Sequence, residues 1–313
     1  MSLFNYNEKT QTLTIPYFYD IQLYNLPKET KVIIFEESLD KKSKFNQPIN
    51  KELLPTNLIT LILGHSFNQL VNNLPNTLLF LTIGNKFNRF VDSLPTSITH
   101  LKLGNCFNQS VDSLPSSITH LTLGHAFNRR IDKLPKSLVS LTLGDNFNKP
   151  VDGNLLPTSI THLTFGWDFN QPVENLPSSI THLKFSIDFN QPVNALPKNI
   201  LFLDLGDKFN NSIDLLPKNI LFLTVGHFFN QSLEKIPHSI TCLGFQSTTQ
   251  INDIPASVNI VKIYFYRDDK YNANVENLPS TINKIIVNDM TKIHRIIKIP
   301  FGCEVVEEKL FIP

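Results

Sequence analysis

A phrase of 14 residues recurs along most of the chain and constrains its fold more than any other feature. Pro95 to Asn108 reads PTSITHLKLGNCFN, and from Pro115 nearly the same words return as PSSITHLTLGHAFN. Successive Phe-Asn pairs lie 20 residues apart, apart from two steps of 22. The ten copies of the pair begin at Phe45, Phe67, Phe87, Phe107, Phe127, Phe147, Phe169, Phe189, Phe209 and Phe229. A fixed period of this length predicts a solenoid, in which each unit buries its apolar face on its neighbours.

Each unit has two halves with different patterns. Around Pro95, six apolar positions are expected to point inward: Phe87, Val91, Leu94, Ile98, Leu101 and Leu103. The stretch from Ile98 to Leu103 alternates as a short strand does, and Gly104 is expected to end it by freeing the backbone to turn. The other half contains recurring Pro, which favours turns and short 3₁₀ segments on the convex side over a real helix. One parallel strand per rung of about 20 residues is the predicted architecture.

The Phe-Asn pair itself predicts two columns. The stacked Phe side chains would form an aromatic spine, and the Asn side chains, which both donate and accept, would form a ladder buried in the coil. Asn108, Asn210 and Asn230 each begin an Asn-x-Ser glycosylation sequon. Because a glycan needs an exposed acceptor, the expected burial makes these sequons coincidental.

The unit SITHLTLGHAFNRRIDKLPKS resembles the FNIP repeat, which is named for its Phe-Asn-Ile/Val-Pro signature and is related to leucine-rich repeats. The resemblance covers roughly residues 26 to 290, although the Pro of the signature is kept only at Pro48, Pro150, Pro172 and Pro192. It implies a leucine-rich-repeat-like solenoid with little helix that acts as a protein-binding array. Similar proteins are known mainly from social amoebae and from giant viruses that infect amoebae. Several of them carry an F-box ahead of the repeats, which implies the presentation of substrates to a ubiquitin ligase.

An F-box is not expected in this chain. Leu26-Pro27-Lys28-Glu29 resembles the start of one, but only 18 residues separate Pro27 from Phe45, too few for the helices of an F-box. The same Leu-Pro pair is explained as the anchor of the first repeat.

The ends depart from the period and are interpreted as caps. Residues 1–26 alternate at Leu13, Ile15 and Tyr17 and again at Ile21 and Leu23, which predicts a strand pair. After Phe229 the period drifts, and the last residues carry charges that would block end-to-end stacking. These charges are Glu304, Glu307, Glu308 and Lys309. We expect an N-terminal cap over 1–26, a solenoid over 27–290 and a C-terminal cap over 291–313, together forming one continuous domain.

Composition limits the partner and the compartment. Lys and Arg number 28 against 27 Asp and Glu, which gives no electrostatic reason to expect nucleic acid or a membrane surface as partner. The N-terminus lacks the features of a secretory signal, and no apolar stretch reaches the length of a membrane helix. Cys106, Cys242 and Cys303 lie several rungs apart, too far for a disulfide. We expect a monomer in the cytoplasm of the producing or host cell.

The strand residues that alternate with the buried leucines define an outward face. From each Pro, one column of this face reads Thr60, Phe80, His100, His120, Ser140, His162, His182, Phe202, Phe222 and Cys242. The second column reads Ile62, Thr82, Lys102, Thr122, Thr142, Thr164, Lys184, Asp204, Thr224 and Gly244. Because solenoids bind partners on such faces, we predict a protein-binding surface. Its candidate residues are Phe80, His100, Lys102, His120, His162, His182, Lys184, Phe202, Asp204 and Phe222.

The histidine column has three interpretations. Stacked imidazoles could hold a metal, respond to pH, or form a plain polar ladder copied with the repeat. No carboxylate or thiol column stands beside them to complete a metal site, so the plain ladder is favoured and no metal or other cofactor is expected.

Phe202 and Phe222 also have two interpretations. Adjacent exposed rings beside Lys184 and Asp204 have the composition of a binding patch. Alternatively, the rings lie across neighbouring strands and only shield the sheet.

The sequence contains no motif that indicates catalysis. It lacks a Gly-rich phosphate loop, a Cys pair at zinc spacing and a nucleophile elbow. We therefore predict a non-enzymatic interaction scaffold, with no catalytic residue. Two alternatives stay open: a substrate receptor that reaches a ubiquitin ligase through a separate chain, and a structural or decoy protein without a specific partner.

Overall fold

A computed structural model describes residues 4–151, 155–249, 251 and 253–308 of the chain. The chain divides into two compact units, the first formed by residues 1–150 and 154–166 and the second by 151–153 and 167–313. The first unit holds nine strands: β1 (Asn5–Asn7), β2 (Thr12–Ile15), β3 (Val32–Phe35), β4 (Thr60–Ile62), β5 (Phe80–Thr82), β6 (His100–Lys102), β7 (His120–Thr122), β8 (Ser140–Thr142) and β9 (His162–Thr164).

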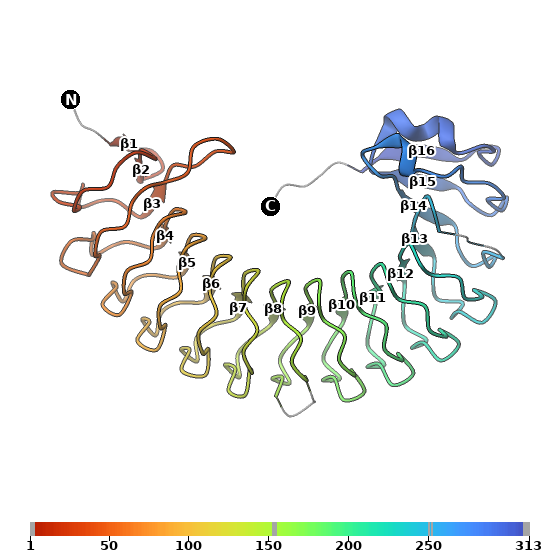
Figure 1. The fold of residues 1–313 in the computed structure, drawn as a ribbon, viewed down its shortest axis with the longest axis horizontal. Coiled ribbons are helices and arrows are strands. Elements are labelled where there is room, and N and C mark those ends of the chain that lie inside the picture. Colours follow the sequence, from red (N-terminus) through yellow and green to blue (C-terminus); the bar gives the residue numbers. More distant parts are fainter. Residues whose placement is uncertain (1–3, 152–154, 250, 252, 309–313) are drawn as a thin grey trace. The chain divides into compact units, whose positions relative to one another are not determined.

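The second unit is built in the same way and adds two short 3₁₀ helices. Its elements are β10 (His182–Lys184), β11 (Phe202–Asp204), β12 (Phe222–Val225), β13 (Cys242–Gln246), β14 (Ile260–Tyr264), η1 (Asp269–Tyr271), β15 (Lys284–Val287), η2 (Met290–Arg295) and β16 (Glu304–Glu307). Within each unit, every turn of the coil contributes one strand, and the strands lie on the concave side (Figure 1). Each unit is therefore a parallel β-solenoid of the predicted kind.

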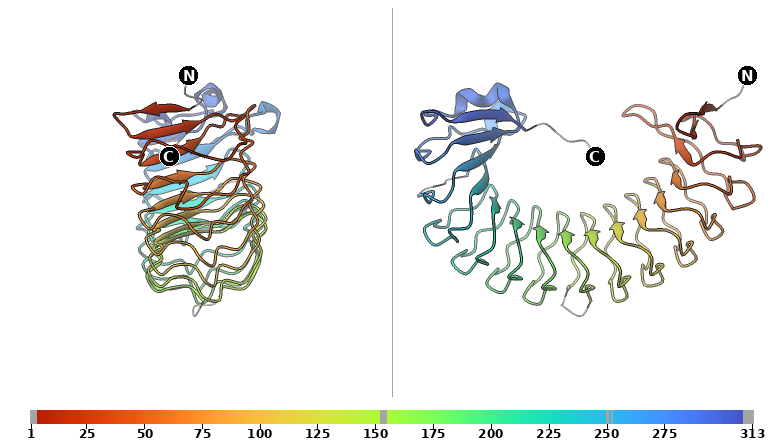
Figure 2. Two further views of the ribbon diagram at one scale, coloured as in Figure 1. Left: turned by 90° about the vertical axis from the view of Figure 1, so that its left-hand side faces the viewer. Right: turned by 180° about the vertical axis from the view of Figure 1, so that it is seen from behind.

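Successive strands pair in parallel and in a constant register. In the first unit this holds from β2 to β9, and in the second from β10 to β16. His100 is paired with His120, and Leu101 with Leu121. Residues 20 apart in sequence thus become neighbours in a column, as the repeat predicts. The ribbon of Figure 2 shows the strand of each turn on one side and the turn-rich half on the other.

The core contains the side chains that the period places inside. All six inward positions of the turn anchored at Pro95 are at most 6% exposed. The Phe residues of the Phe-Asn pairs stack with ring centroids 6.0–6.4 Å apart and planes within 13° of parallel, from Phe45 to Phe147 in the first unit and from Phe169 to Phe229 in the second. The aromatic spine is confirmed. It ends at Phe229, because the next turn places the buried Thr249 at the corresponding position.

The asparagine ladder exists, but its expected burial is wrong. In each unit, the backbone N–H of one Asn donates to the side-chain oxygen of the Asn one turn earlier, at 2.8–3.2 Å. Asp20 supplies the first acceptor, to the N–H of Asn46. Asn88, Asn190 and Asn230 are nevertheless exposed, and the other ladder residues are half-buried. The ladder therefore lies at least partly at the surface of the coil, and burial no longer argues against the three sequons.

Glycine has a different role from the one expected. Among the glycines that follow the strands, only Gly206 has a positive φ, at 74°. A Cβ at Gly84, Gly104, Gly124 or Gly144 would lie 1.8–2.4 Å from the carbonyl oxygen of the glycine one turn earlier. The column of glycines therefore exists because the backbones of adjacent turns approach too closely for a side chain.

Two local predictions need adjustment. The N-terminal strand pair is formed by β1 and β2, which run antiparallel, and the residues around Ile21 and Leu23 are not in a strand. Leu23 is buried although it is not in a strand, so its apolar side chain fitted the alternation expected of a strand. In the regular turns, the half opposite the strand consists of turns and bends, and the 3₁₀ segments that the structure describes lie only at η1 and η2.

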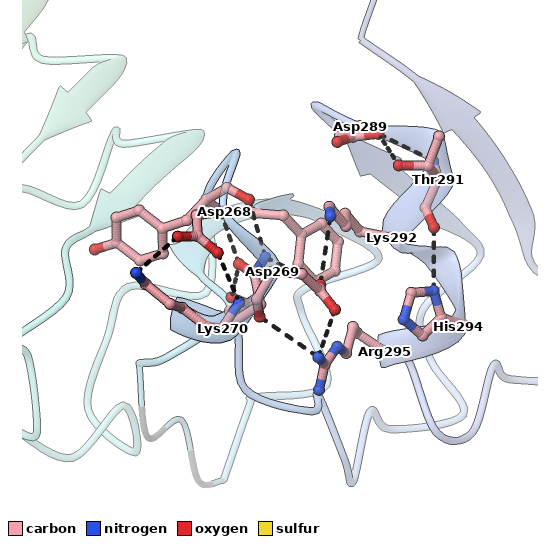
Figure 3. A network of polar contacts seen from close by, with 12 residues as sticks. Asp268, Asp269, Lys270, Asp289, Thr291, Lys292, His294 and Arg295 are labelled. Carbon is pink, nitrogen blue, oxygen red and sulfur yellow. Dashed lines mark hydrogen bonds and ion pairs between the residues drawn. The ribbon is translucent and has the colours of Figure 1, made fainter.

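The turns after Phe229 are held by polar contacts that occur once. Asp268 and Asp289 cap η1 and η2 by accepting from the backbone N–H two residues on, at 3.2 and 3.0 Å. The Asp269 carboxylate accepts from Arg295 at 2.7 Å and lies 3.4 Å from the Lys292 ammonium (Figure 3). The hydrogen bond from Arg295 holds the pKa of Asp269 down, at about 2. This network joins the segment that carries η1 to the one that carries η2. Lys309, predicted as part of the C-terminal cap, lies outside the described residues.

Candidate functional site

The outward face of the first unit carries a stack of aromatic and imidazole rings. Phe80, His100 and His120 occupy equivalent positions on β5, β6 and β7. The centroids of Phe80 and His100 lie 4.6 Å apart, and those of His100 and His120 lie 4.2 Å apart with planes 7° from parallel. Lys102 is exposed on the same face, between Thr82 and Thr122. The strand register therefore brings these four predicted site residues together.

A threonine orients each histidine of this face. The hydroxyls of Thr99 and Thr119 lie 2.9 Å from the Nδ1 atoms of His100 and His120, and Thr161 lies 2.8 Å from that of His162. Burial, and secondarily the neighbouring His120, lower the pKa of His100. His100 is thus held mainly in its neutral form at neutral pH.

The outward face of the second unit is more apolar. His182, Phe202 and Phe222 follow each other on β10, β11 and β12, with centroid distances of 6.0 Å and then 6.4 Å. The planes of Phe202 and Phe222 are tilted by 36°, and Phe222 is 40% exposed. The two rings therefore cover the sheet without stacking face to face. Leu201 and Leu221, which come directly before β11 and β12, are 38% and 39% exposed. We call Leu201, Phe202, Leu221 and Phe222 the apolar patch.

An ion pair between an exposed lysine and a largely buried aspartate borders this patch. Lys184 lies 3.2 Å from Asp204, whose side chain is only 16% exposed and which also accepts from the backbone N–H of Gly206. Burial raises the pKa of Asp204, and Lys184 partly offsets the rise. Burial and the nearby Asp204 raise the pKa of Asp207, which accepts a hydrogen bond from Gln246. The second unit thus combines apolar and acidic groups on one face.

The two leucines of the patch were not predicted as site residues, although the sequence carries a signal for them. Every turn with His on the outward face has Thr before it, as in Thr99-His100, and each turn with Phe there has Leu before it, as in Leu201-Phe202. The Thr position was assigned to neither face. Its side chain is at least partly accessible, so a Leu there enlarges the exposed apolar area.

The described residues contain neither a metal-binding cluster nor a membrane-spanning helix. They contain no group of three or more His, Cys, Asp or Glu side chains that could hold a metal ion. In the part of the chain that the structure covers, no helical segment has the length and apolarity that crossing a bilayer requires.

Comparison with known proteins adds a family and a fold. Six segments match the model of the FNIP Repeat and together span residues 45–208. They cover residues 45–86, 87–126, 107–146, 127–168, 147–188 and 169–208. The crystal structure of CroV588, described as a novel circular LRR protein structure, is similar with a TM-score of 0.67 and 33% identity. The match covers 94% of this chain and 49% of that one, so the chain spans about half the length of CroV588.

A more distant similarity is to YopM from Yersinia enterocolitica WA-314, with a TM-score of 0.45 and 15% identity over 95% of this chain and 73% of that one. Among curated proteins, no match is found.

Proposed function

Because the chain belongs to the FNIP repeat family, we propose that it is a non-enzymatic scaffold that binds a protein partner through the outward face of its strands. Solenoids of this leucine-rich-repeat-like type typically act as interaction scaffolds, since stacked repeats present an extended and rigid surface. Near-identical turns also supply periodic rather than convergent polar groups, which disfavours catalysis. Action in the cytoplasm as a monomer belongs to the same proposal.

The observation that supports this function best is the apolar patch of the second unit. Leu201, Leu221 and Phe222 leave more than a third of their surface in water. Leu201 and Leu221 lie in adjacent turns, where the backbone N–H of Leu221 donates to the carbonyl of Leu201 at 2.9 Å. The largest contiguous apolar patch on the surface of a monomer is often functional. Aromatic residues at the centre of an interface typically provide much of its affinity.

The proposal is tested by affinity capture from extract of the host cell. The native chain is compared with a Phe202→Ser, Phe222→Ser double variant. A control variant carries Phe90→Ser and Leu215→Ser, which alter apolar residues of the turn half that are more exposed than Phe202 and Phe222. The native and control chains should retain a specific partner that the double variant loses.

Equal capture by all three chains would show that the patch does not bind. A cullin or its adaptor among the captured proteins would identify the substrate receptor for a ubiquitin ligase. The absence of any specific partner would favour the decoy function. Thermal unfolding of the three chains checks that the substitutions leave the fold intact.

A further inference from the structure

The outward face of the first unit differs from the apolar patch in its charge. The outward positions from β4 to β9 carry Lys102 and histidines but no carboxylate. Lys102 is exposed and has no ion-pair partner among the described residues, whereas Lys184, at the equivalent position of the second unit, is neutralised by Asp204. A cation left without a partner on a sheet face is available to an acidic ligand.

Hydrogen bonds define which imidazole nitrogen faces a partner. The hydroxyl of Thr99 donates to the carbonyl of Leu79 at 3.3 Å, and that of Thr119 to the carbonyl of Thr99 at 3.2 Å. A hydroxyl has one proton, so each Thr oxygen accepts from the Nδ1–H of the following histidine. The Nε2 atoms of His100 and His120 have no hydrogen-bond partner among the described residues. They accept when the ring is neutral and donate once it is protonated.

Protonation of these rings is coupled to the charge of whatever binds. Both rings of the stack cannot be charged at 4.2 Å without repulsion, unless an anion lies beside them. No outward group on β5 to β8 supplies that anion. In the turns beyond these strands, Lys86 adds positive charge, and Asp145 is engaged with His125 at 3.0 Å.

We propose that Phe80, His100, His120 and Lys102, called the histidine face, dock an acidic segment of a protein partner and bind it more tightly as the pH falls. The inference rests on the proposed function and adds the chemistry of the partner at a second surface. Carboxylates of the segment accept from the Lys102 ammonium and from the protonated Nε2 atoms, while Phe80 contacts its apolar atoms. Binding then takes up protons, because the carboxylates stabilise the imidazolium form.

The test uses a fluorescein-labelled peptide of about ten glutamates, whose binding is followed by fluorescence anisotropy at low salt, where surface charges are least screened. Affinity should rise about fivefold between about pH 7.5 and about pH 5.5, from one or two exposed charge pairs gained. Calorimetry in two buffers of different ionisation enthalpy should show proton uptake. A His100→Gln, His120→Gln variant should lose the pH response and the proton uptake, and Lys102→Gln should weaken binding at both pH values.

Matched controls are His238→Gln and Lys133→Gln, which remove exposed groups away from the histidine face. They should bind as the native chain does. Binding without pH response, or a response that survives in the double histidine variant, would overturn the proposal. So would an oligothymidine of similar charge that binds as tightly with the same pH response, because the face would then select negative charge of any polymer.

This test and the test of the proposed function can fail independently of each other. The Phe202→Ser, Phe222→Ser chain should bind the glutamate peptide normally, since the apolar patch lies on the second unit. If this variant loses its cellular partner while the peptide fails to bind any chain, the scaffold function stands and the histidine face is excluded as an acidic-segment site.

Discussion

The regular turns and the turns after Phe229 achieve the same parallel coil by different means. A regular turn repeats three contacts in register: a ring on a ring, an Asn oxygen on a backbone N–H, and a glycine against the preceding glycine. The later turns lose the Phe-Asn pair and replace it with polar contacts that occur once, such as Arg295 to Asp269. Each repeated contact links a turn to the turn before it and to the turn after it. A contact that occurs once, such as Arg295 to Asp269, joins only two segments near the C-terminal end.

This difference teaches where a substitution should matter. A residue in a column serves the turn before it and the turn after it, so its loss is felt on both sides. A residue in the later turns serves one contact, and neighbouring contacts there are of a different kind. Pairs of matched substitutions, one in each region, measure this difference.

The largest effect should come from the aromatic spine. Phe107 is fully buried with rings 6.1 Å away on both sides, so Phe107→Ala should lower the free energy of unfolding by about 3–5 kcal/mol. Phe301→Ala in the last turns removes a fully exposed ring and should change it by less than about 0.5 kcal/mol. Denaturant unfolding of both variants checks the pair, and equal losses would contradict the comparison.

The glycine column should give the next effect. A Cβ in Gly144→Ala would lie 1.8 Å from the carbonyl oxygen of Gly124, and the displaced backbone should cost about 3 kcal/mol. Gly302→Ala meets no atom within 4 Å and is strained only by its φ of 77°, which should cost about 1 kcal/mol. Thermal unfolding ranks the two. The reverse order would show that backbone conformation, and not the approach of turns, selects glycine.

The asparagine ladder should give a smaller difference. Asn88 accepts from the N–H of Asn108, so Asn88→Ala leaves that N–H without its acceptor and should cost about 1 kcal/mol. Asn230 ends the ladder, and its side-chain oxygen accepts only from the adjacent Gln231 among the described residues. Asn230→Ala should therefore lower the free energy of unfolding by only a few tenths of a kcal/mol. Hydrogen exchange at Asn108 should accelerate in Asn88→Ala, and an unchanged rate would refute the ladder as a stabilising contact.

The smallest effect concerns Asp269 and depends on pH. Its folded pKa of about 2 lies below the ordinary value, so its contribution to stability is present above about pH 4 and is lost as the pH falls through about 2. Asp269→Asn should lower the melting temperature slightly at neutral pH, and the difference from the native chain should shrink as the pH falls and vanish below about pH 2. A difference that persists in acid would mean that the ion pairs of η1 and η2 contribute nothing measurable.

The repeat made the fold predictable, because any side chain copied every 20 residues must occupy the same place in every turn. The inward set around Pro95 and the pairing of His100 with His120 followed directly. The exposure of the Asn side chains did not, since spacing says which residues align and not on which side of the backbone a turn carries them. The role of the glycines was not predicted for a similar reason. The sequence of one turn does not show how closely its backbone approaches that of the next turn.

For the candidate site, the sequence predicts which residues align in a column. It does not predict how exposed each of them is. Lys184 beside Asp204 could be read from the register, yet only the structure shows that Asp204 is buried there. Leu201 and Leu221 come directly before strands of three or four residues, and the alternation within such a short strand does not say whether the preceding side chain is exposed. The assignment of these residues to binding stays a prediction until the capture and anisotropy experiments are done.

The direction of the asparagine ladder bears on how such a protein changes in length. Within each unit, the described steps run backward, from the N–H of one turn to the oxygen of the turn before. The series of the first unit starts on Asp20, which needs only to accept. A duplicated segment of 20 residues inserted between two regular turns brings its own donor and its own acceptor. Duplication of a 20-residue segment therefore lengthens the array by a whole turn, and deletion of one shortens it, while the residues that begin and end the ladder stay unaltered.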